Sequence, residues 1–356
     1  MSKIAVYAIA KNEEQFIQRW YDSVKEADYV CVLDTGSTDN TVNMLKLCGA
    51  IVESKIISPW RFDVARNESL KIIPEDANIL ICVDLDEIIQ PGWAEIIRNE
   101  FKGTRGKYRY IWSHNEDGSP GVEFYSDKIH VKGYEWVNPV HEVLKTNMDE
   151  SYCFLNIRID HYPDHTKSRS NYLPLLELAI QEDPENDRNM HYLGREYMFH
   201  GQYDKAIETL EKHINMPSAV WDAERAASMR FIARCKIMQG DEEAGELWYN
   251  RAIAEAPQYR EGWYETCKIM YHAKRWKSCI FYGERCIEIM QKPLSYICEA
   301  EAWGPRVYDM LSIAYWNTGR ILKAVEAAER ALTYGEDERV RENLKIMQNR
   351  VATCLN

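Results

Sequence analysis

Short apolar runs alternate with amphipathic segments over the first ninety residues of the chain. The apolar runs, which are typical of buried strands, are residues 3–9, 29–34, 51–54 and 79–86. The segments between them with apolar positions at helical spacing are residues 13–27, 41–48 and 61–73. Strands separated by helices predict a parallel α/β sheet.

The pattern changes from about residue 103. Four shorter strand-like runs follow: YRYIWS (108–113), GVEFYS (121–126), KIHVKG (128–133) and FLNIRID (154–160). They predict an antiparallel extension, built of hairpins and a mixed edge, that completes the sheet. A first domain over residues 1–166 is expected from these strands and helices.

Residues 167–356 are helical and repetitive, and small residues recur at two positions of each repeat. The first position is occupied by Gly194, Ala233, Cys267 and Ser312, and the second by Ala206, Gly245, Cys279 and Ala324. The middle spacing of 34 residues is the tetratricopeptide period, and residues 294–304 supply the longest insertion. This predicts about four repeats and a capping helix over 337–354, with a plain helical bundle as the alternative.

Composition supports two domains and a cation-binding first half. The chain has 356 residues and a net charge of −12, and residues 1–166 carry 18 Lys/Arg against 27 Asp/Glu, a balance of −9. That balance suits a cation and argues against broad binding of nucleic acid. No stretch has the roughly 20 apolar residues of a membrane span. The N-terminus is interpreted as a strand and not a signal peptide, and ten scattered cysteines indicate reduced thiols in the cytoplasm.

Two acidic segments follow apolar strands. Asp84-Leu85-Asp86 ends the run 79–86, where open α/β sheets place ligands, and alternation along a strand would point both aspartates to one side. Their oxygens suit Mg²⁺ or Mn²⁺ bound to a diphosphate. Asp34-Thr35-Gly36 also follows a strand. It is either a capped turn or a contact to a nucleoside.

Six motifs follow one another along the first part of the chain: Ala10-Lys11-Asn12-Glu13, Asp34-Thr35-Gly36-Ser37-Thr38-Asp39, Phe62-x-x-Ala65-Arg66-Asn67, Asp84-Leu85-Asp86-Glu87, Val140-His141-Glu142 and Ile159-Asp160-His161-Tyr162. In this order they resemble the motifs of family 2 glycosyltransferases, which have the GT-A fold, in a branch followed by tetratricopeptide repeats. The branch's usual His-Tyr-Gly-Tyr is His161-Tyr162-Pro163-Asp164 here, so the contacts of that loop differ from the pattern.

The resemblance implies a metal-dependent, inverting transfer from a nucleotide-diphosphate sugar, with UDP-sugar favoured. It implies binding of the donor by Ala8, Glu13, Asp34, Arg66, Asn67 and Asp84. It implies that Asp86 and His161 hold Mn²⁺ or Mg²⁺.

Glu142 is the first candidate for the base that deprotonates the acceptor, with His141 orienting it or contacting donor phosphate. The alternative for this pair is a structural ion pair at the end of a hairpin, and Glu87 and Asp160 are weaker candidates for the base. Four aromatic residues near the expected site could stack on a sugar or simply pack, namely Trp60, Trp112, Tyr134 and Trp136.

The acceptor is left open between a protein or peptide, which a repeat surface suits, and a surface glycan. The repeats also leave a homo-oligomer open, and DNA is a lesser alternative that the acidic charge disfavours. A second hypothesis is an interaction scaffold whose first domain binds nucleotide sugar without catalysis. A nucleotidyltransferase would need a Gly-rich, basic phosphate loop, which AIAKNEEQ does not provide.

Overall fold

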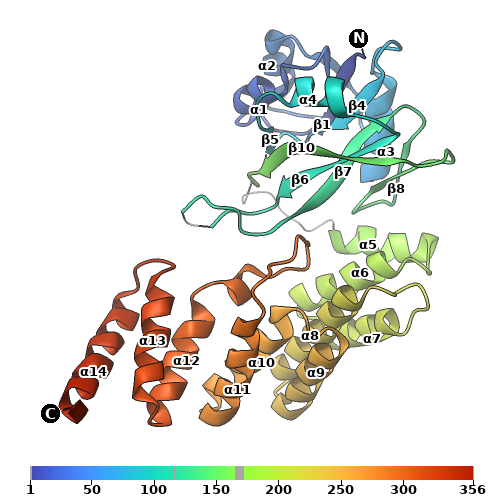
Figure 1. Ribbon diagram of the computed structural model, residues 1–356. Coiled ribbons are helices and arrows are strands. Elements are labelled where there is room, and N and C mark those ends of the chain that lie inside the picture. Colours follow the sequence, from blue (N-terminus) through green and yellow to red (C-terminus); the bar gives the residue numbers. More distant parts are fainter. Residues whose placement is uncertain (1, 116, 165–171, 356) are drawn as a thin grey trace. The chain divides into compact units, whose positions relative to one another are not determined.

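The computed structural model describes residues 2–115, 117–164 and 172–355, and it divides into two compact units (Figure 1). The first contains residues 1–182 and a short segment at 294–296, and the second contains residues 183–293 and 297–356. The expected boundary at residues 166 and 167 lies outside the described residues. Helix α5 (Tyr172–Glu182), which was expected in the second domain, groups with the first unit.

Parallel strands form one half of an eight-stranded sheet in the first unit, whose order is β3-β2-β1-β4-β7-β6-β10-β5 (Figure 1). The parallel strands are β1 (Ile4–Ala10), β2 (Tyr29–Asp34), β3 (Ile51–Ser54) and β4 (Ile79–Cys82). The helices between them are α1 (Ile17–Val24), α2 (Thr41–Cys48) and α3 (Phe62–Lys71). The predicted parallel α/β sheet is confirmed, and β2, β3 and α2 have the predicted bounds.

The other half of the sheet is mixed. It contains β5 (Glu87–Ile89), β6 (Arg105–Ile111), β7 (Glu123–Val131) and β10 (Tyr152–His161), with helix α4 (Trp93–Glu100) after β5. Strand β7 is antiparallel to β4 and β6, whereas β10 is parallel to β6 and antiparallel to β5. The runs 121–126 and 128–133, expected as two strands, form the single strand β7 because β6 pairs along both of them.

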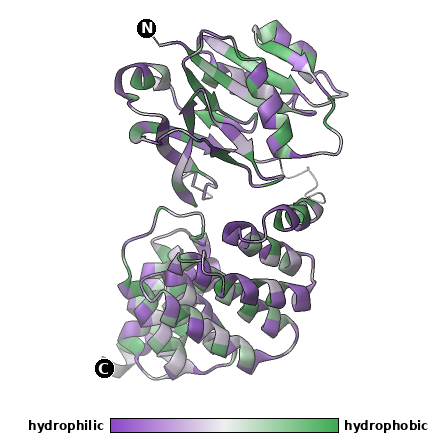
Figure 2. Cartoon of the chain, turned by 90° about the vertical axis from the view of Figure 1, so that its right-hand side faces the viewer, coloured by the Kyte–Doolittle hydropathy of each residue, from purple (hydrophilic) through white to green (hydrophobic). Residues whose placement is uncertain are grey.

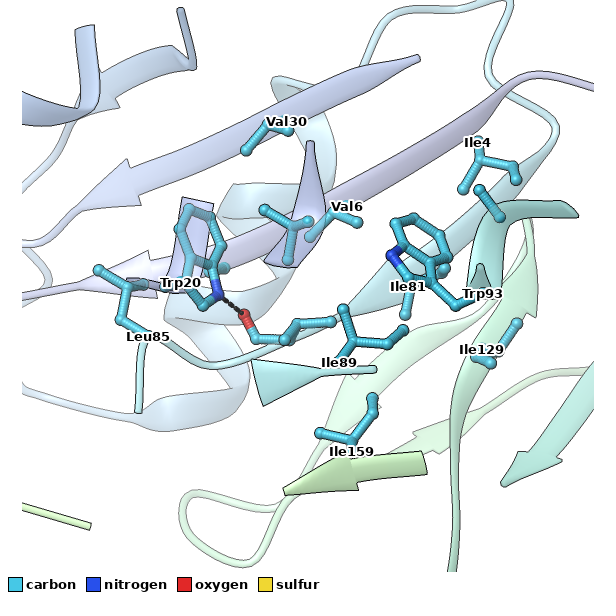
Figure 3. Packing of buried hydrophobic residues seen from close by; sticks show 14 of the residues in the cluster. Ile4, Val6, Trp20, Val30, Ile81, Leu85, Ile89, Trp93, Ile129 and Ile159 are labelled. Atoms are coloured by element: carbon cyan, nitrogen blue, oxygen red, sulfur yellow. Dashed lines mark hydrogen bonds between the residues drawn. The ribbon is translucent and has the colours of Figure 1, made fainter. Parts of the chain in front are cut away.

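Both faces of the parallel strands are buried, which explains their unbroken apolar sequence. In β1, Ile4 and Val6 face one core cluster, while Ala5 and Tyr7 face another. Figure 3 shows the first cluster, in which the Trp20 indole lies among aliphatic side chains and donates a hydrogen bond to a backbone carbonyl. Alternation along one strand therefore supplies apolar side chains to both sides of the sheet.

A buried chain of hydrogen bonds ties a second, two-stranded sheet, β8 (Glu135–Val137) and β9 (Val143–Lys145), to the main one. Trp136 Nε1 donates to Tyr7 Oη at 3.0 Å, and Tyr7 Oη lies 2.8 Å from His130 Nε2. Burial lowers the pKa of His130 to about 4, and its neutral ring donates from Nδ1 to Val131 O at 2.8 Å, which leaves Nε2 as an acceptor. The Tyr7 hydroxyl therefore accepts from the Trp136 indole and donates to His130 Nε2.

The second unit consists of four helix pairs and a final helix. The pairs are α6 (Asp187–Phe199) with α7 (Tyr203–Ile214), α8 (Asp222–Met238) with α9 (Glu242–Glu255), α10 (Arg260–His272) with α11 (Trp276–Glu288), and α12 (Arg306–Asn317) with α13 (Ile321–Leu332). The final helix is α14 (Glu338–Leu355), and the insertion before α12 contains a 3₁₀ turn. Figure 2 shows hydrophobic and hydrophilic positions on the same helices, as expected for amphipathic packing.

The small residues predicted for the repeats lie where paired helices touch. A Cβ atom at Gly194 would lie 2.5 Å from Leu210 Cγ in α7, and one at Gly245 would lie 2.5 Å from Ile237 Cγ1 in α8. A larger side chain at either position would therefore push the paired helices apart. None of the described helices is both long enough and apolar enough to cross a membrane.

Replacing Tyr7 with Phe should destabilise the first unit. The change leaves the Trp136 N–H without an acceptor and His130 Nε2 without a donor, both inside the core, at a cost of about 1–3 kcal/mol. Hydrogen exchange of peptides from β1 and β8 measures the free energy of local opening. Tyr125→Phe is the control, because that side chain is 46% exposed. Equal protection in the two variants would contradict the role of the Tyr7 hydroxyl.

Candidate active site

The Asp84-Leu85-Asp86 motif lies in a turn and not on a strand. Strand β4 ends at Cys82, and the Glu87 amide donates to Asp84 O at 2.9 Å, which closes the turn before β5. The predicted strand 79–86 is therefore too long, and strand alternation does not place both aspartates on one side. Leu85 points into the core (Figure 3), while each aspartate contacts a different partner.

The core holds this turn from two sides. Trp20 Nε1 donates to Val83 O at 3.2 Å, and Glu87 Oε2 accepts from the Asp84 amide at 2.8 Å. Glu87 Oε1 accepts from Tyr110 Oη at 2.7 Å. Burial raises the pKa of Glu87. Because Glu87 is only 1% exposed and both of its oxygens accept hydrogen bonds, its role is to hold the turn in place.

Asp84 faces two cations. Arg66 binds it through Nη1 at 2.7 Å and Nη2 at 3.0 Å, and Lys128 Nζ lies 3.0 Å from Asp84 Oδ2. Burial opposes ionisation of Asp84, but Arg66 and Lys128 outweigh it and hold the pKa of the carboxyl below its usual value. Both oxygens of Asp84 are thus engaged by the chain's own side chains.

Lys128 is a site residue that the sequence reasoning missed. It lies in β7, between Asp84 and Glu87, and its Nζ is 3.2 Å from Glu87 Oε1. The available signal was a lysine in the strand run KIHV, one position before the core residue Ile129. A charge in a strand with few exposed positions indicates a buried partner.

Asp86 and His161 are brought together by the pairing of β5 with β10. In that antiparallel pair His161 lies opposite Glu87, and the Tyr162 amide donates to Asp86 O at 2.7 Å. His161 Nε2 lies 3.3 Å from Asp86 Oδ2, and His161 Nδ1 lies 3.1 Å from Trp112 O. Burial opposes protonation of the ring, but the Asp86 carboxylate outweighs it and raises the pKa of His161.

The residues around Asp86 and His161 fit a divalent cation. Two donors bound to one ion at about 2.1 Å stand roughly 3 Å apart, close to the observed 3.3 Å. The Nδ1 contact to a backbone carbonyl directs Nε2 toward Asp86, as is usual for metal-binding histidines. Trp112, which is 48% exposed, stacks on His161 with ring centroids 4.5 Å apart.

His141 and Glu142 lie in the loop between β8 and β9. Glu142 Oε1 is 2.6 Å from Arg66 Nε, so one guanidinium binds both Glu142 and Asp84. His141 has a left-handed φ of +52°, and its ring lies 5.8 Å from that of Tyr172. The structure thus places Glu142 beside Asp84, with one carboxylate oxygen on Arg66.

Two loops follow β1 and β2, the parallel strands next to β4 in the sheet. Asn12 Oδ1 accepts from the Thr38 amide at 2.8 Å, and the Glu13 amide donates to Thr41 Oγ1 at 2.8 Å. Asp34, at the end of β2, is 3% exposed and accepts from the Ser37 amide at 3.1 Å. Ala8 is fully buried within β1, opposite Val32 of β2.

Other candidates lie where they support the fold. Asn67 binds both backbone groups of Trp136 at 2.8 Å, which fixes β8 against α3. Tyr134 and Trp136 are 6% and 4% exposed and pack in the core, so they cannot stack on a sugar. Asp160 is fully buried. Its partners are His114, Gln90 and Arg158.

Replacing Arg66 with Lys should destabilise the first unit by on the order of 3 kcal/mol, because an ammonium cannot bind Asp84 twice and Glu142 at the same time. Hydrogen exchange of peptides from α3 and from the β8–β9 loop measures the loss. Arg109→Lys is the control, because that arginine makes a half-exposed pair with Glu123 that should be worth under about 1 kcal/mol. Similar losses in the two variants would argue against the bridging role.

Comparisons with known families agree with the two units. Residues 5–122 match the family described as glycosyl transferase family 2, and residues 305–336, which include α12 and α13, match a tetratricopeptide repeat. The crystal structure of MamA protein covers 46% of this chain and 81% of its own, with 21% identity and a TM-score of 0.36. A second structure of MamA covers 49% and 95%, with 22% identity and a TM-score of 0.37.

Curated relatives carry glycosyltransferase names. An uncharacterised glycosyltransferase of Rickettsia typhi is 48% identical over 61 residues, which are 17% of this chain and 20% of that protein. The SPbeta prophage-derived glycosyltransferase SunS of Bacillus subtilis is 24% identical over 232 residues, which are 58% of this chain and 52% of that protein. The chain thus spans about half or less of the length of these relatives. The family resemblance is confirmed by a glycosyl transferase family 2 match over residues 5–122 and a tetratricopeptide-repeat match over residues 305–336.

Proposed function

We propose that the first unit transfers a sugar, with inversion, from a nucleotide-diphosphate sugar to an acceptor nucleophile, and that Mn²⁺ or Mg²⁺ is required. The observation that carries the proposal is the pair Asp86 Oδ2 and His161 Nε2, 3.3 Å apart, beside an Asp84 already bound by Arg66. Asp84 is bound by Arg66 and Lys128. Asp86 faces the His161 imidazole at a distance that suits two ligands of one metal ion.

The nucleoside would lie against the two loops after β1 and β2. Glu13 and Asp34 are the groups proposed to hold it, with uridine favoured by the family resemblance, whereas the fully buried Ala8 is not available to a ligand. Both loops are cross-linked by hydrogen bonds such as Asn12 to Thr38, so their backbone is ordered before a ligand arrives. Arg66 and Lys128 would hold Asp84 in place as the donor sugar binds against it.

The reaction would be a displacement at the anomeric carbon. The acceptor forms a bond to that carbon while the bond from the carbon to the diphosphate oxygen breaks, and the acceptor's proton passes to a base. The cation held by Asp86 and His161 would stabilise negative charge on the diphosphate that leaves. Trp112 would offer an exposed ring to a sugar at the same place.

Glu142 is the proposed base. Arg66 binds its Oε1, and its Oε2 makes no hydrogen bond among the described residues. Arg66 would orient the carboxylate, so that Oε2 can accept the proton. Glu87 and Asp160 are poor rivals because their carboxylates are buried and engaged.

The acceptor is proposed to be a protein or peptide, or else a surface glycan, and the repeats would contact it or a second copy of the chain. The acidic first half disfavours DNA. A cytoplasmic location is supported by the described cysteines, which are all free thiols.

Donor binding should depend on Asp86. With Mn²⁺ present, one member of a panel of nucleotide sugars should raise the melting temperature of the full chain and be slowly hydrolysed. Asp86→Ala should abolish the Mn²⁺-dependent part of both effects, because the carboxylate ligand is lost. Asp117→Ala, an acid in an exposed turn, is the control. If Asp86→Ala hydrolyses the donor with Mn²⁺ as fast as the unchanged chain, Asp86 is not a metal ligand.

Transfer should depend on Glu142 more than donor binding does. Glu142→Gln keeps an oxygen for Arg66 but cannot take a proton at pH 7, so transfer should fall by about 10²–10⁴-fold. The donor's effect on the melting temperature should be unchanged. Glu135→Gln, an exposed glutamate in the same hairpin, is the control. If transfer survives in Glu142→Gln, the base lies elsewhere.

A further inference from the structure

Three helix ends meet at a buried polar group in the second unit, at the start of the repeats (Figure 1 labels α6, α7 and α8). Asp187 is in the first turn of α6, His213 in the last turn of α7, and Glu224 in the first turn of α8. One nitrogen or oxygen from each lies within 4.8 Å of the other two. The set combines two carboxylates with one imidazole.

His213 points to a missing ligand. The side chain is fully buried, yet Nε2 has no hydrogen-bond partner among the described residues. The Glu224 carboxylate approaches it to 3.7 Å, which is too long for a hydrogen bond. A buried ring nitrogen without a hydrogen-bond partner lowers the stability of the folded state. A ligand that binds this nitrogen would remove that cost.

The opposite side of the same ring is held in place. His213 Nδ1 lies 2.9 Å from Ser228 Oγ, which lies 2.7 Å from His191 Nδ1. When His213 donates to Ser228 and Ser228 donates to His191, the lone pair of His213 Nε2 points at the carboxylates. A histidine oriented through its second nitrogen is the usual arrangement around a bound metal.

We propose that Asp187, His213 and Glu224 bind one divalent cation of the Zn²⁺ type, with water as the fourth ligand. Zn²⁺ accepts imidazole nitrogen together with carboxylate oxygen, and bonds of 2.0–2.1 Å place tetrahedral ligands about 3.3 Å apart. The gap of 3.7 Å between His213 and Glu224 closes to that spacing by small side-chain rotations. Two carboxylates balance the charge of the ion. The site joins α6, α7 and α8 and serves structure, separately from the proposed reaction.

The competing explanation is that each residue interacts with its own helix end. Acids favour the N-terminus of a helix and histidine favours the C-terminus, as at Asp187, Glu224 and His213. This account leaves His213 Nε2 unexplained, and the two accounts differ in whether a metal binds.

The experiment uses the full chain in an Asp86→Ala background, which removes the proposed catalytic cation. The chain is stripped with a chelator and titrated with Zn²⁺ against a chromophoric chelator. We expect one bound Zn²⁺ per chain and a higher melting temperature for the second unit. Adding Asp187→Asn, a half-exposed position that spares the core, should weaken binding at least about tenfold.

Glu242→Gln is the matched control, because Glu242 is an exposed acid in the first turn of α9. It should leave Zn²⁺ binding unchanged. Glu224→Gln, checked for folding by circular dichroism, gives a second ligand variant. The proposal is overturned when the Asp86→Ala chain takes up no Zn²⁺, or when neither Asp187→Asn nor Glu224→Gln weakens the binding. Neither result bears on whether the first unit transfers sugar.

Discussion

The first unit depends on one buried guanidinium. The Arg66 side chain is 6% exposed, and a charge at that depth is tolerable only with close partners. Its partners Asp84 and Glu142 lie 18 and 76 residues away in sequence. Helix α3, the turn after β4 and the loop after β8 must therefore assemble together, or each leaves an uncompensated charge inside the protein. The same requirement gathers acidic groups at the carboxyl edge of the parallel strands, where this fold binds ligands.

Because the buried Arg66 needs a close partner, the two aspartates of the motif make different contacts. Asp84 neutralises Arg66 and Lys128, and its lowered pKa reflects this internal use. Asp86 has His161 as its neighbour, because β5 returns along β10. Leu85 enforces the separation, since its burial in the core turns the flanking side chains in different directions. The two aspartates of one short motif thus have different partners, Arg66 and Lys128 for Asp84 and His161 for Asp86.

The sequence predicts the parts of this arrangement that depend on local pattern. The bounds of β2 and α2 follow from apolar runs ended by turns, and α2 stops at Gly49, whose φ is +99°. The end of β4 and the three-residue strand β5 were missed, because periodicity needs longer segments and their ends are set by pairing with distant strands. The proximity of Asp86, in the turn before β5, to His161 in β10 was predicted only through the family resemblance. Lys128 was not predicted, because its partners Asp84 and Glu87 lie more than 40 residues away in sequence.

Buried charges in both units are paired with side chains from other elements, and His213 is an exception. In the first, the buried or partly buried carboxylates of Asp84, Glu87 and Glu142 are matched by Arg66, Lys128 and Tyr110 from other elements. In the second, Arg230 and Arg234 are matched by Glu299 and Glu265. His213 differs: its Nδ1 contacts Ser228, but no described side chain makes a hydrogen bond to its Nε2. The proposed metal ion would supply the missing partner of His213 Nε2. By linking α6, α7 and α8, it would also make the first helices of the repeats a more rigid surface for any acceptor.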